Sequence, residues 1–220
     1  MCAYVLGPRI GYGREPFVPY NLALTLAGAS LLWVGWFGFN AGSAGAADGR
    51  AGMAMLVTQI ASAVAALAWM LAEWTARSRA TLLGACSGAV AGLVAITPAS
   101  GYVGVSGALV IGLVAGMVCY WGATGLKRRL GADDSLDVFG IHGVGGLVGA
   151  ILTGVFAQKS ISGVEASLQA QLVGAFATLA YSAIASLVLL KLIDWTIGLR
   201  VDETTERVGL DIALHGEQIS

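Results

Sequence analysis

Charged residues are scarce in this sequence, and their scarcity excludes most classes of soluble protein. Only 11% of the 220 residues are Asp, Glu, Lys or Arg, whereas 57% are hydrophobic; a soluble domain carries about 25% charged residues. The 12 basic and 13 acidic residues leave a net charge of -1, which excludes a nucleic-acid-binding protein that works through a basic surface. The composition indicates an integral membrane protein.

Motifs for metal binding and enzymatic chemistry are also missing. The three cysteines, Cys2, Cys86 and Cys119, stand at no CxxC or zinc-ligand spacing and predict no disulfide framework. The sequence contains no nucleophile elbow and no phosphate-cradling P-loop. We therefore expect neither an enzyme nor a protein with a cofactor or a metal ion.

Long apolar stretches are what the sequence does contain. A helix that crosses a hydrocarbon core about 30 Å thick needs about 20 mostly apolar residues. Six stretches meet this requirement and predict an all-α polytopic membrane protein with six transmembrane helices. The predicted spans are residues 19–45, 52–74, 81–98, 102–125, 138–157 and 168–193. The turn-rich segment 97–101 predicts a tight hairpin between the third and fourth spans.

The basic residues are distributed unevenly over the loops between these spans. Because Lys and Arg accumulate in cytoplasmic loops, the imbalance predicts that both termini are cytoplasmic and that the protein lies in the inner (plasma) membrane. Ten basic residues fall on the side of the termini, namely Arg9, Arg14, Arg77, Arg79, Lys127, Arg128, Arg129, Lys191, Arg200 and Arg207. Two, Arg50 and Lys159, fall on the other side.

Glycine is abundant, at 32 residues, and many glycines are spaced four apart. Such residues share one helix face, where a neighbouring helix can approach closely. We expect packing at most of them, although a narrow conduit lined by glycine would produce the same pattern. The spaced glycines are Gly84, Gly88 and Gly92, then Gly112 and Gly116, Gly145 and Gly149, and Gly38 and Gly42.

His142 is the only titratable side chain in the predicted span 138–157, and glycines surround it. An ionisable group inside a membrane helix is costly and marks a functional site by default. A neutral imidazole both donates and accepts a hydrogen bond, which suits a small polar solute or a proton relay. The alternative is a histidine that is bonded to a backbone carbonyl between helices.

Polar and aromatic residues gather near two helix ends. Trp36 presents an aromatic face that attracts cations, but from the residue alone an interfacial anchor is favoured. Ser43 adds a hydroxyl that either serves a site or bonds back to its own helix. Of the carboxylates before the fifth span, we expect Asp137 to cap the helix and Asp133 and Asp134 to be solvated.

Several ordered strings in the sequence resemble the ammonium transporter family (Amt/Mep/Rh). These are Gly35-Trp36-Phe37-Gly38-Phe39-Asn40-Ala41-Gly42-Ser43, Leu83-Gly84-Ala85-Cys86-Ser87-Gly88-Ala89, Ile96-Thr97-Pro98-Ala99, Asp137-Val138-Phe139-Gly140-Ile141-His142-Gly143 and Gly198-Leu199-Arg200. The similarity extends from about Leu6 to the end of the chain.

The resemblance implies a homotrimer in which each subunit has eleven helices and its own hydrophobic pore. The six spans would match the sixth to eleventh helices, with residues 1–7 as a remnant of the fifth. His142 would match one of two pore histidines, Phe39 an aromatic gate and Ser43 a hydroxyl at an outer ammonium site. Trp36 and Ser87 would lie near the conduit.

The same resemblance implies what lies outside this sequence. The second pore histidine and the remaining aromatic residues of the outer site would belong to a front half that precedes residue 1, so these residues by themselves would insert in a membrane without conducting. Residues 1–199 would form a partial membrane domain. Residues 200–220 would form a cytoplasmic tail, which either is solvated or helps a PII-type signalling protein to bind.

Three functions are therefore open. The first is ammonium or ammonia transport through a hydrophobic pore, by this chain or as part of a transporter. The second is a membrane sensor or assembly partner that does not transport, and the third is an inactive fragment.

Overall fold

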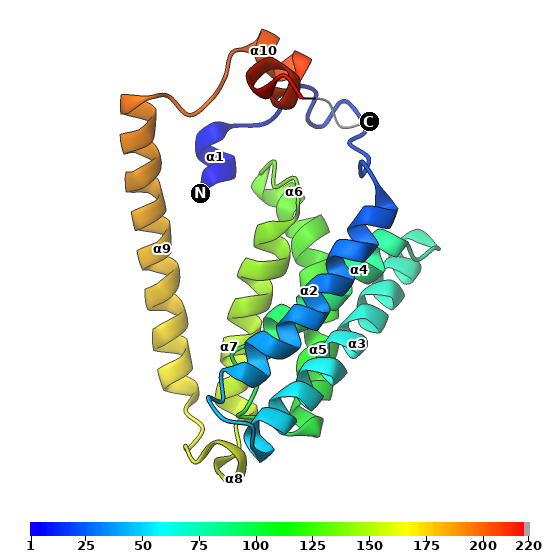
Figure 1. Ribbon diagram of the computed structural model, residues 1–220, viewed down its shortest axis with the longest axis vertical. Helices are drawn as coiled ribbons and strands as arrows, with labels where there is room; N and C mark the ends of the chain where they lie inside the picture. Colours follow the sequence, from blue (N-terminus) through cyan, green and yellow to red (C-terminus); the bar gives the residue numbers. More distant parts are fainter. Residues whose placement is uncertain (218–220) are drawn as a thin grey trace. The chain divides into compact units, whose positions relative to one another are not determined.

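The computed structural model describes residues 1–217, and these are helical over most of their length (Figure 1). No strand occurs in this described part of the chain. The prediction of an all-α protein is confirmed. The short N-terminal helix α1 (Cys2–Leu6) agrees with the helical character expected of residues 1–7.

Five helical stretches among the described residues are long and apolar enough to cross a membrane. The segment predicted as a span over residues 81–98 is helix α4 (Leu82–Ile96), whose 15 residues extend about 22 Å and are shorter than the hydrocarbon core. A count of six spans therefore stays a prediction. The five long stretches are α2 (Leu22–Gly42), α3 (Gly49–Arg77), Val105–Leu130, Phe139–Phe156 and α9 (Leu168–Thr196).

Two of these long stretches contain a turn of π-helix. The stretch Val105–Leu130 consists of α5 (Val105–Trp121), the π-helical η1 (Gly122–Leu126) and α6 (Lys127–Leu130). The stretch Phe139–Phe156 consists of the π-helical η2 (Phe139–Gly143) and α7 (Val144–Phe156). The remaining elements are short: α8 (Lys159–Ser162), α10 (Glu203–Val208) and the π-helical η3 (Asp211–His215).

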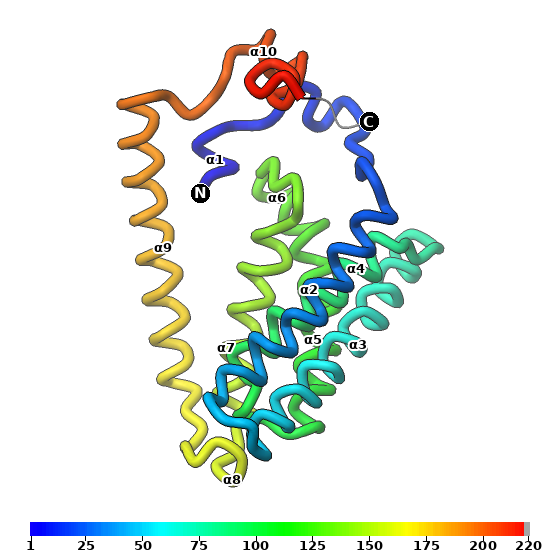
Figure 2. The backbone as a smooth tube through the Cα atoms, viewed as in Figure 1, coloured from blue at the N-terminus to red at the C-terminus, as the bar shows by residue number. Residues whose placement is uncertain are grey.

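The chain divides into two compact units. The larger unit comprises Pro19–Leu130 and Asp134–Ala177. The smaller unit comprises Met1–Val18, Gly131–Asp133 and the chain from Thr178 onward. Figure 2 follows the backbone through both units.

In the larger unit, α3 packs along α4 and α5, and α4 also contacts α2 and α7. The buried core between α3, α4 and α5 consists mainly of alanine, valine and isoleucine side chains. Small side chains allow close helix approach, which is the main source of packing energy when lipid is as apolar as the protein interior. The turn over residues 97–102 joins α4 to α5, as the sequence predicted. Gly101 lies in this turn and has a positive φ of +76°.

The glycine pairs on α4 and α5 serve packing, as expected. A β-carbon on Gly92 would lie 2.5 Å from the carbonyl oxygen of Ala61, and one on Gly116 would lie 2.5 Å from that of Ala65. Gly38 and Gly42 of α2 differ, because no atom of the described residues 1–217 lies within 4 Å of such a β-carbon. Their spacing alone does not create a partner helix.

A buried glutamate fixes the start of α4. Glu73 of α3 is 5% exposed, and its carboxylate accepts hydrogen bonds from the backbone N–H and the hydroxyl of Thr81, at 3.0 Å for each nearest oxygen. The Thr81 hydroxyl oxygen in turn accepts a hydrogen bond of 2.9 Å from the N–H of Gly84 and caps the helix. Glu73 and Thr81 thereby connect α3 to the first turn of α4.

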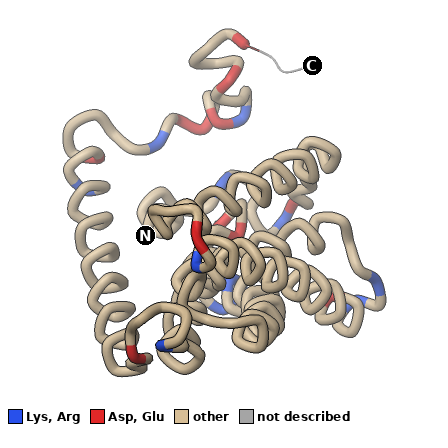
Figure 3. Tube along the Cα trace, turned by 60° about the horizontal axis from the view of Figure 1, so that its bottom comes forward, with Lys and Arg blue, Asp and Glu red and all other residues tan. Residues whose placement is uncertain are grey.

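Charges in the larger unit collect near helix ends, and the helices between them are uncharged over long distances (Figure 3). Arg77 lies at the end of α3, and Lys127 begins α6, whereas Arg50 lies at the opposite end of α3. Asn21 and Asp48 cap α2 and α3 through their side chains. The helix boundaries thus agree with the polar residues that separate the predicted spans.

Charge pairs organise the smaller unit. Arg9 forms an ion pair with Asp133 at 2.7 Å, and Arg200 forms one with Glu206 at 2.7 Å. Arg200 also donates hydrogen bonds to the carbonyl oxygens of Leu6 and Pro8. The start and the tail of the chain are therefore joined by polar contacts within this unit.

Candidate functional site

His142 lies in the π-helical turn η2 of the larger unit. Its side chain is exposed, and its imidazole makes no hydrogen bond to any of residues 1–217. Isolated π turns are rare and are found frequently at functional sites. The alternative of a histidine that is bonded to a backbone carbonyl is wrong within this described part of the chain.

Asp134, rather than Asp137, caps the helix that carries His142. The Asp134 carboxylate accepts hydrogen bonds from the N–H groups of Val138 at 3.0 Å and Phe139 at 2.7 Å. Asp137 instead pairs with Lys127 at 2.8 Å and adopts a positive φ of 55°. The first N–H groups of the helix are bonded to Asp134, and the carboxylate of Asp137 is bonded to Lys127, so the prediction that Asp137 caps the helix is wrong.

Neither of the other two carboxylates is simply solvated. The Asp133 side chain is 2% exposed in its pair with Arg9. Burial raises the pKa of Asp137, and the hydrogen bond from Lys127 opposes that shift. The spacing of the three carboxylates did not reveal these pairings because Arg9 is distant in sequence.

Trp36 of α2 is turned toward α4. Its indole N–H donates a hydrogen bond of 2.7 Å to the hydroxyl of Thr97, and that hydroxyl donates one of 2.7 Å to the carbonyl of Leu93. The indole also packs against the buried cluster that contains Ile141, the residue before His142. Trp36 is therefore half-buried in the unit and hydrogen-bonded to α4.

Phe39 and Ser43 follow Trp36 along α2. The rings of Trp36 and Phe39 meet edge to face with centroids 6.2 Å apart, and Phe39 is 62% exposed. The Ser43 hydroxyl donates a hydrogen bond of 2.7 Å to the carbonyl of Phe39, which is the bond back to its own helix that the sequence left open. Its oxygen retains lone pairs that can accept from a cation.

Ser87 lies on α4 and is half-buried, with no hydrogen bond from its hydroxyl to the described residues 1–217. The structure thus brings Trp36 into contact with Phe39 and with the buried cluster to which Ile141 belongs, and α4, which carries Ser87, contacts the turn η2 that carries His142. Sequence reasoning missed Thr97, although a hydroxyl directly after an apolar helix is a recognisable signal.

A second omission is the buried Thr58, whose hydroxyl accepts a hydrogen bond of 2.9 Å from the side-chain amide of the buried Asn40. Both polar residues stand in otherwise apolar spans, which is the signal that could have identified them. Within the described residues, no group of His, Cys, Asp and Glu side chains is arranged to hold a metal ion.

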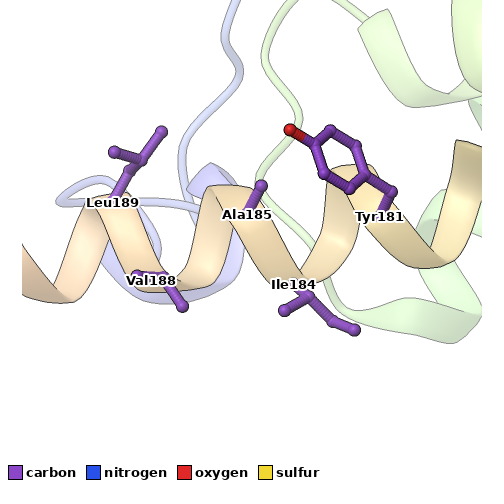
Figure 4. A pocket seen from close by; sticks show the side chains of 5 residues that line it. All are labelled: Tyr181, Ile184, Ala185, Val188 and Leu189. Atoms are coloured by element: carbon purple, nitrogen blue, oxygen red, sulfur yellow. The ribbon is translucent and has the colours of Figure 1, made fainter.

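A hollow of about 460 Å³ lies on α9 and is lined by Tyr181, Ile184, Ala185, Val188 and Leu189. Figure 4 shows that the side chains extend to different sides of this one helix instead of converging. The Tyr181 hydroxyl is the only polar side-chain group among them. The hollow therefore offers no site for chemistry.

A comparison of the sequence with known protein families identifies the family of the chain. The model of the Ammonium Transporter Family matches residues 1–219. The chain belongs to the ammonium transporter family. Its apolar helices are accordingly those of a multi-pass membrane protein, as the composition predicted.

Curated relatives of the chain are named ammonium transporters. The chain is 48% identical over 232 residues to "Ammonium transporter" of Mycobacterium tuberculosis (strain H37Rv), an alignment that covers 99% of this chain and 48% of the relative. It is 44% identical to "Ammonium transporter Amt1" of Archaeoglobus fulgidus, covering 98% of this chain and 56% of that protein. The chain thus spans about half the length of the curated relatives it matches.

Solved structures of related proteins have a similar fold. The chain is similar to Mep2 of Saccharomyces cerevisiae with a TM-score of 0.84 and 36% identity, over 92% of this chain and 49% of that one. The resemblance to the predicted ammonium transporter fold is therefore confirmed.

Proposed function

We propose that this chain forms part of a pathway that carries ammonium or ammonia across the membrane. The observation that carries this function is His142, which is the sole titratable side chain of the apolar stretch Phe139–Phe156 and has no hydrogen-bond partner among residues 1–217. The match of residues 1–219 to the model of the Ammonium Transporter Family supports the substrate.

The residues on α2 would act at the entrance of this pathway. Phe39 exposes an aromatic face that attracts a cation, and Ser43 offers an oxygen that accepts a hydrogen bond from it. Trp36 would support Phe39 from the side through their edge-to-face contact. Ser87 of α4 would add a hydroxyl to the conduit, since its own hydrogen-bonding groups are unused within the described residues.

His142 would act deeper in the apolar part of the pathway. A bare ammonium ion entering a medium of low dielectric loses hydration worth about 20 kcal/mol in the idealised case. Loss of a proton to give ammonia removes most of that penalty. A neutral imidazole would then offer ammonia a hydrogen bond or pass the proton along.

The test is uptake of labelled methylammonium by a transporter-deficient host that expresses the protein as its gene encodes it. His142→Ala is expected to change the uptake rate or its dependence on pH. His215→Ala is the matched control, because His215 is the other histidine of the chain and lies in the polar tail. Equal uptake by the wild type and His142→Ala would contradict the role of His142.

We further propose a homotrimer in the inner membrane with both termini in the cytoplasm. The uneven distribution of ten and two basic residues supports that orientation. The polar tail from Arg200 would then be available to a PII-type signalling protein. Tags at the two ends that report from the periplasm would contradict the orientation, and equal recovery of a PII-type protein without the tail would contradict the partnership.

The alternative of a sensor that does not transport has one supporting observation. The chain resembles the structure titled "Sensor Amt Protein" with a TM-score of 0.89 and 30% identity, over 97% of this chain and 55% of that one. The higher identity to relatives named transporters favours transport. Uptake above that of the empty host decides between the two functions.

A further inference from the structure

The π-helical turns η1 and η2 contact each other through glycine backbones. A β-carbon on Gly140 would lie 2.6 Å from the backbone nitrogen of Ala123 and 2.8 Å from the carbonyl carbon of Gly122. A β-carbon on Gly122 would lie 2.8 Å from the carbonyl oxygen of Gly140. Because backbone faces backbone on both sides, no side-chain rotation can make room for a methyl group.

The turn that carries His142 is also held on a second side. The buried thiol of Cys119 lies 3.7 Å from the carbonyl oxygen of Ile141, within range of a weak hydrogen bond. At its start, the carboxylate of Asp134 caps the turn through Val138 and Phe139. These contacts fix the residues immediately before His142 while leaving the imidazole itself without a hydrogen-bond partner among the described residues.

The conformation of this turn determines the direction of the imidazole. A π turn contains one residue more than an α turn, and one residue corresponds to a rotation of about 100° around a helix axis. If η2 relaxed into a regular α-helix, the side chains on one side of the turn would rotate relative to those on the other by about that angle. The orientation of His142 relative to α7 therefore depends on the π turn.

We propose that Gly122 and Gly140 are positioning residues for His142, because their backbone contact holds η2 in its π conformation against η1. This inference rests on the proposed function of His142. A side chain at either glycine pushes the two turns apart and displaces the imidazole from the pathway. The entrance residues on α2 are not part of this contact.

The helix that follows offers a matched control. Gly146 lies four residues after His142, and the nearest atom to a β-carbon there is Cγ1 of Val94 at 4.0 Å, an ordinary contact distance. Gly146→Ala therefore makes the same chemical change as Gly140→Ala in the same helical stretch, without the clash.

The experiment measures methylammonium uptake as a function of concentration and pH, normalised to the amount of protein in the membrane. Gly140→Ala and Gly122→Ala are each expected to lower the maximal rate at least about tenfold with KM unchanged, because misplacement by about 1 Å can cost about 100-fold at enzyme sites. Their pH profile should shift in the direction seen for His142→Ala. Gly146→Ala should stay within about twofold of the wild type.

If both glycine variants fail to accumulate in the membrane, Cys119→Ala tests the same inference. It removes the thiol beside Ile141 without adding atoms, so it should lower the maximal rate moderately with KM unchanged. Wild-type kinetics in Gly140→Ala, or in Cys119→Ala where the glycine variants do not accumulate, would overturn the inference. If His142→Ala itself transports normally, the proposed function fails instead, so the two failures are distinguishable.

Discussion

Helix α3 and the long helix α9 are similarly hydrophobic but differ in how much of each is buried among the described residues. The most apolar window of α9 has a mean hydropathy of 2.0, against 1.8 for α3. Yet 44% of the α3 window is buried and none of the α9 window is. Hydropathy identifies both as membrane helices and does not distinguish a packed helix from an unpacked one.

The difference follows from small and polar residues. The 15-residue α4 contains Gly84, Gly88 and Gly92, all of them buried, whereas the 29-residue α9 contains only Gly174, whose surroundings are open. Buried hydrogen bonds such as that from Asn40 to Thr58 occur in the larger unit. The smaller unit relies on charge pairs such as Arg200 with Glu206 and Arg9 with Asp133, in which the arginine is partly exposed.

The largest expected effect comes from filling a glycine contact. In Gly92→Ala the new methyl group meets the backbone of Ala61 and Ser62 at 2.5 and 2.6 Å. We expect a loss of about 3 kcal/mol, at the upper end for overpacking, because backbone must move. Gly174→Ala on α9 is the control and should cost nothing. The measurement is the thermal midpoint of each purified variant in detergent; equal midpoints would show that the α3–α4 contact adapts freely.

Removing a buried acceptor should have the next largest effect. Glu73→Ala leaves the backbone N–H and the hydroxyl of Thr81 without their acceptor, at a cost of about 1–3 kcal/mol for an unsatisfied buried group. Glu165→Ala breaks only the exposed pair with Lys159, and exposed pairs contribute about 0–1 kcal/mol. The same thermal assay compares the two variants. If both lose equal stability, burial is not what gives Glu73 its importance.

A smaller effect is expected at Trp36. Trp36→Phe keeps an aromatic ring and removes the indole N–H that bonds to Thr97, so it should cost about 0.5–1.5 kcal/mol. Trp195→Phe on α9 should be neutral, since Trp195 is 84% exposed. Thr97→Val should reduce the stability less in the Trp36→Phe background than in the wild type, because the hydrogen bond is already absent there. If the two stability losses add fully, the hydrogen bond contributes nothing.

The smallest effect concerns pH and the smaller unit. The N–H of Ile10 and the guanidinium of Arg200 lower the pKa of Glu206. A carboxylate with a lowered folded pKa stabilises above its unfolded value, about 4.3, and that contribution disappears as the pH falls through the folded pKa. The tail should therefore become more susceptible to proteolysis as the pH falls from about 4.3 through the lower folded pKa of Glu206. Glu206→Gln should remove this pH dependence; a tail that is equally protected at all pH values would contradict the prediction.

The sequence by itself determined the class, the helices and the candidate residues. Its apolar stretches predicted the long helices to within a few residues, because hydrocarbon thickness sets a minimum length that composition alone can satisfy. Thr81 at the start of α4 and the turn after Ile96 likewise lie where local signals indicate, since caps and turns involve neighbours in the chain.

Only the tertiary structure decided which of these residues have partners. Gly92 and Gly38 stand in the same four-residue spacing, but only Gly92 meets another backbone. Asp134 caps the helix in place of Asp137 because the positive φ of Asp137 and its pairing with Lys127 cannot be read from spacing. Neither can the π turn around His142, which depends on the backbone of Gly122 lying against Gly140. Each of these outcomes depends on how helices pack or on the backbone conformation of a loop, and the spacing of residues in the sequence does not specify either.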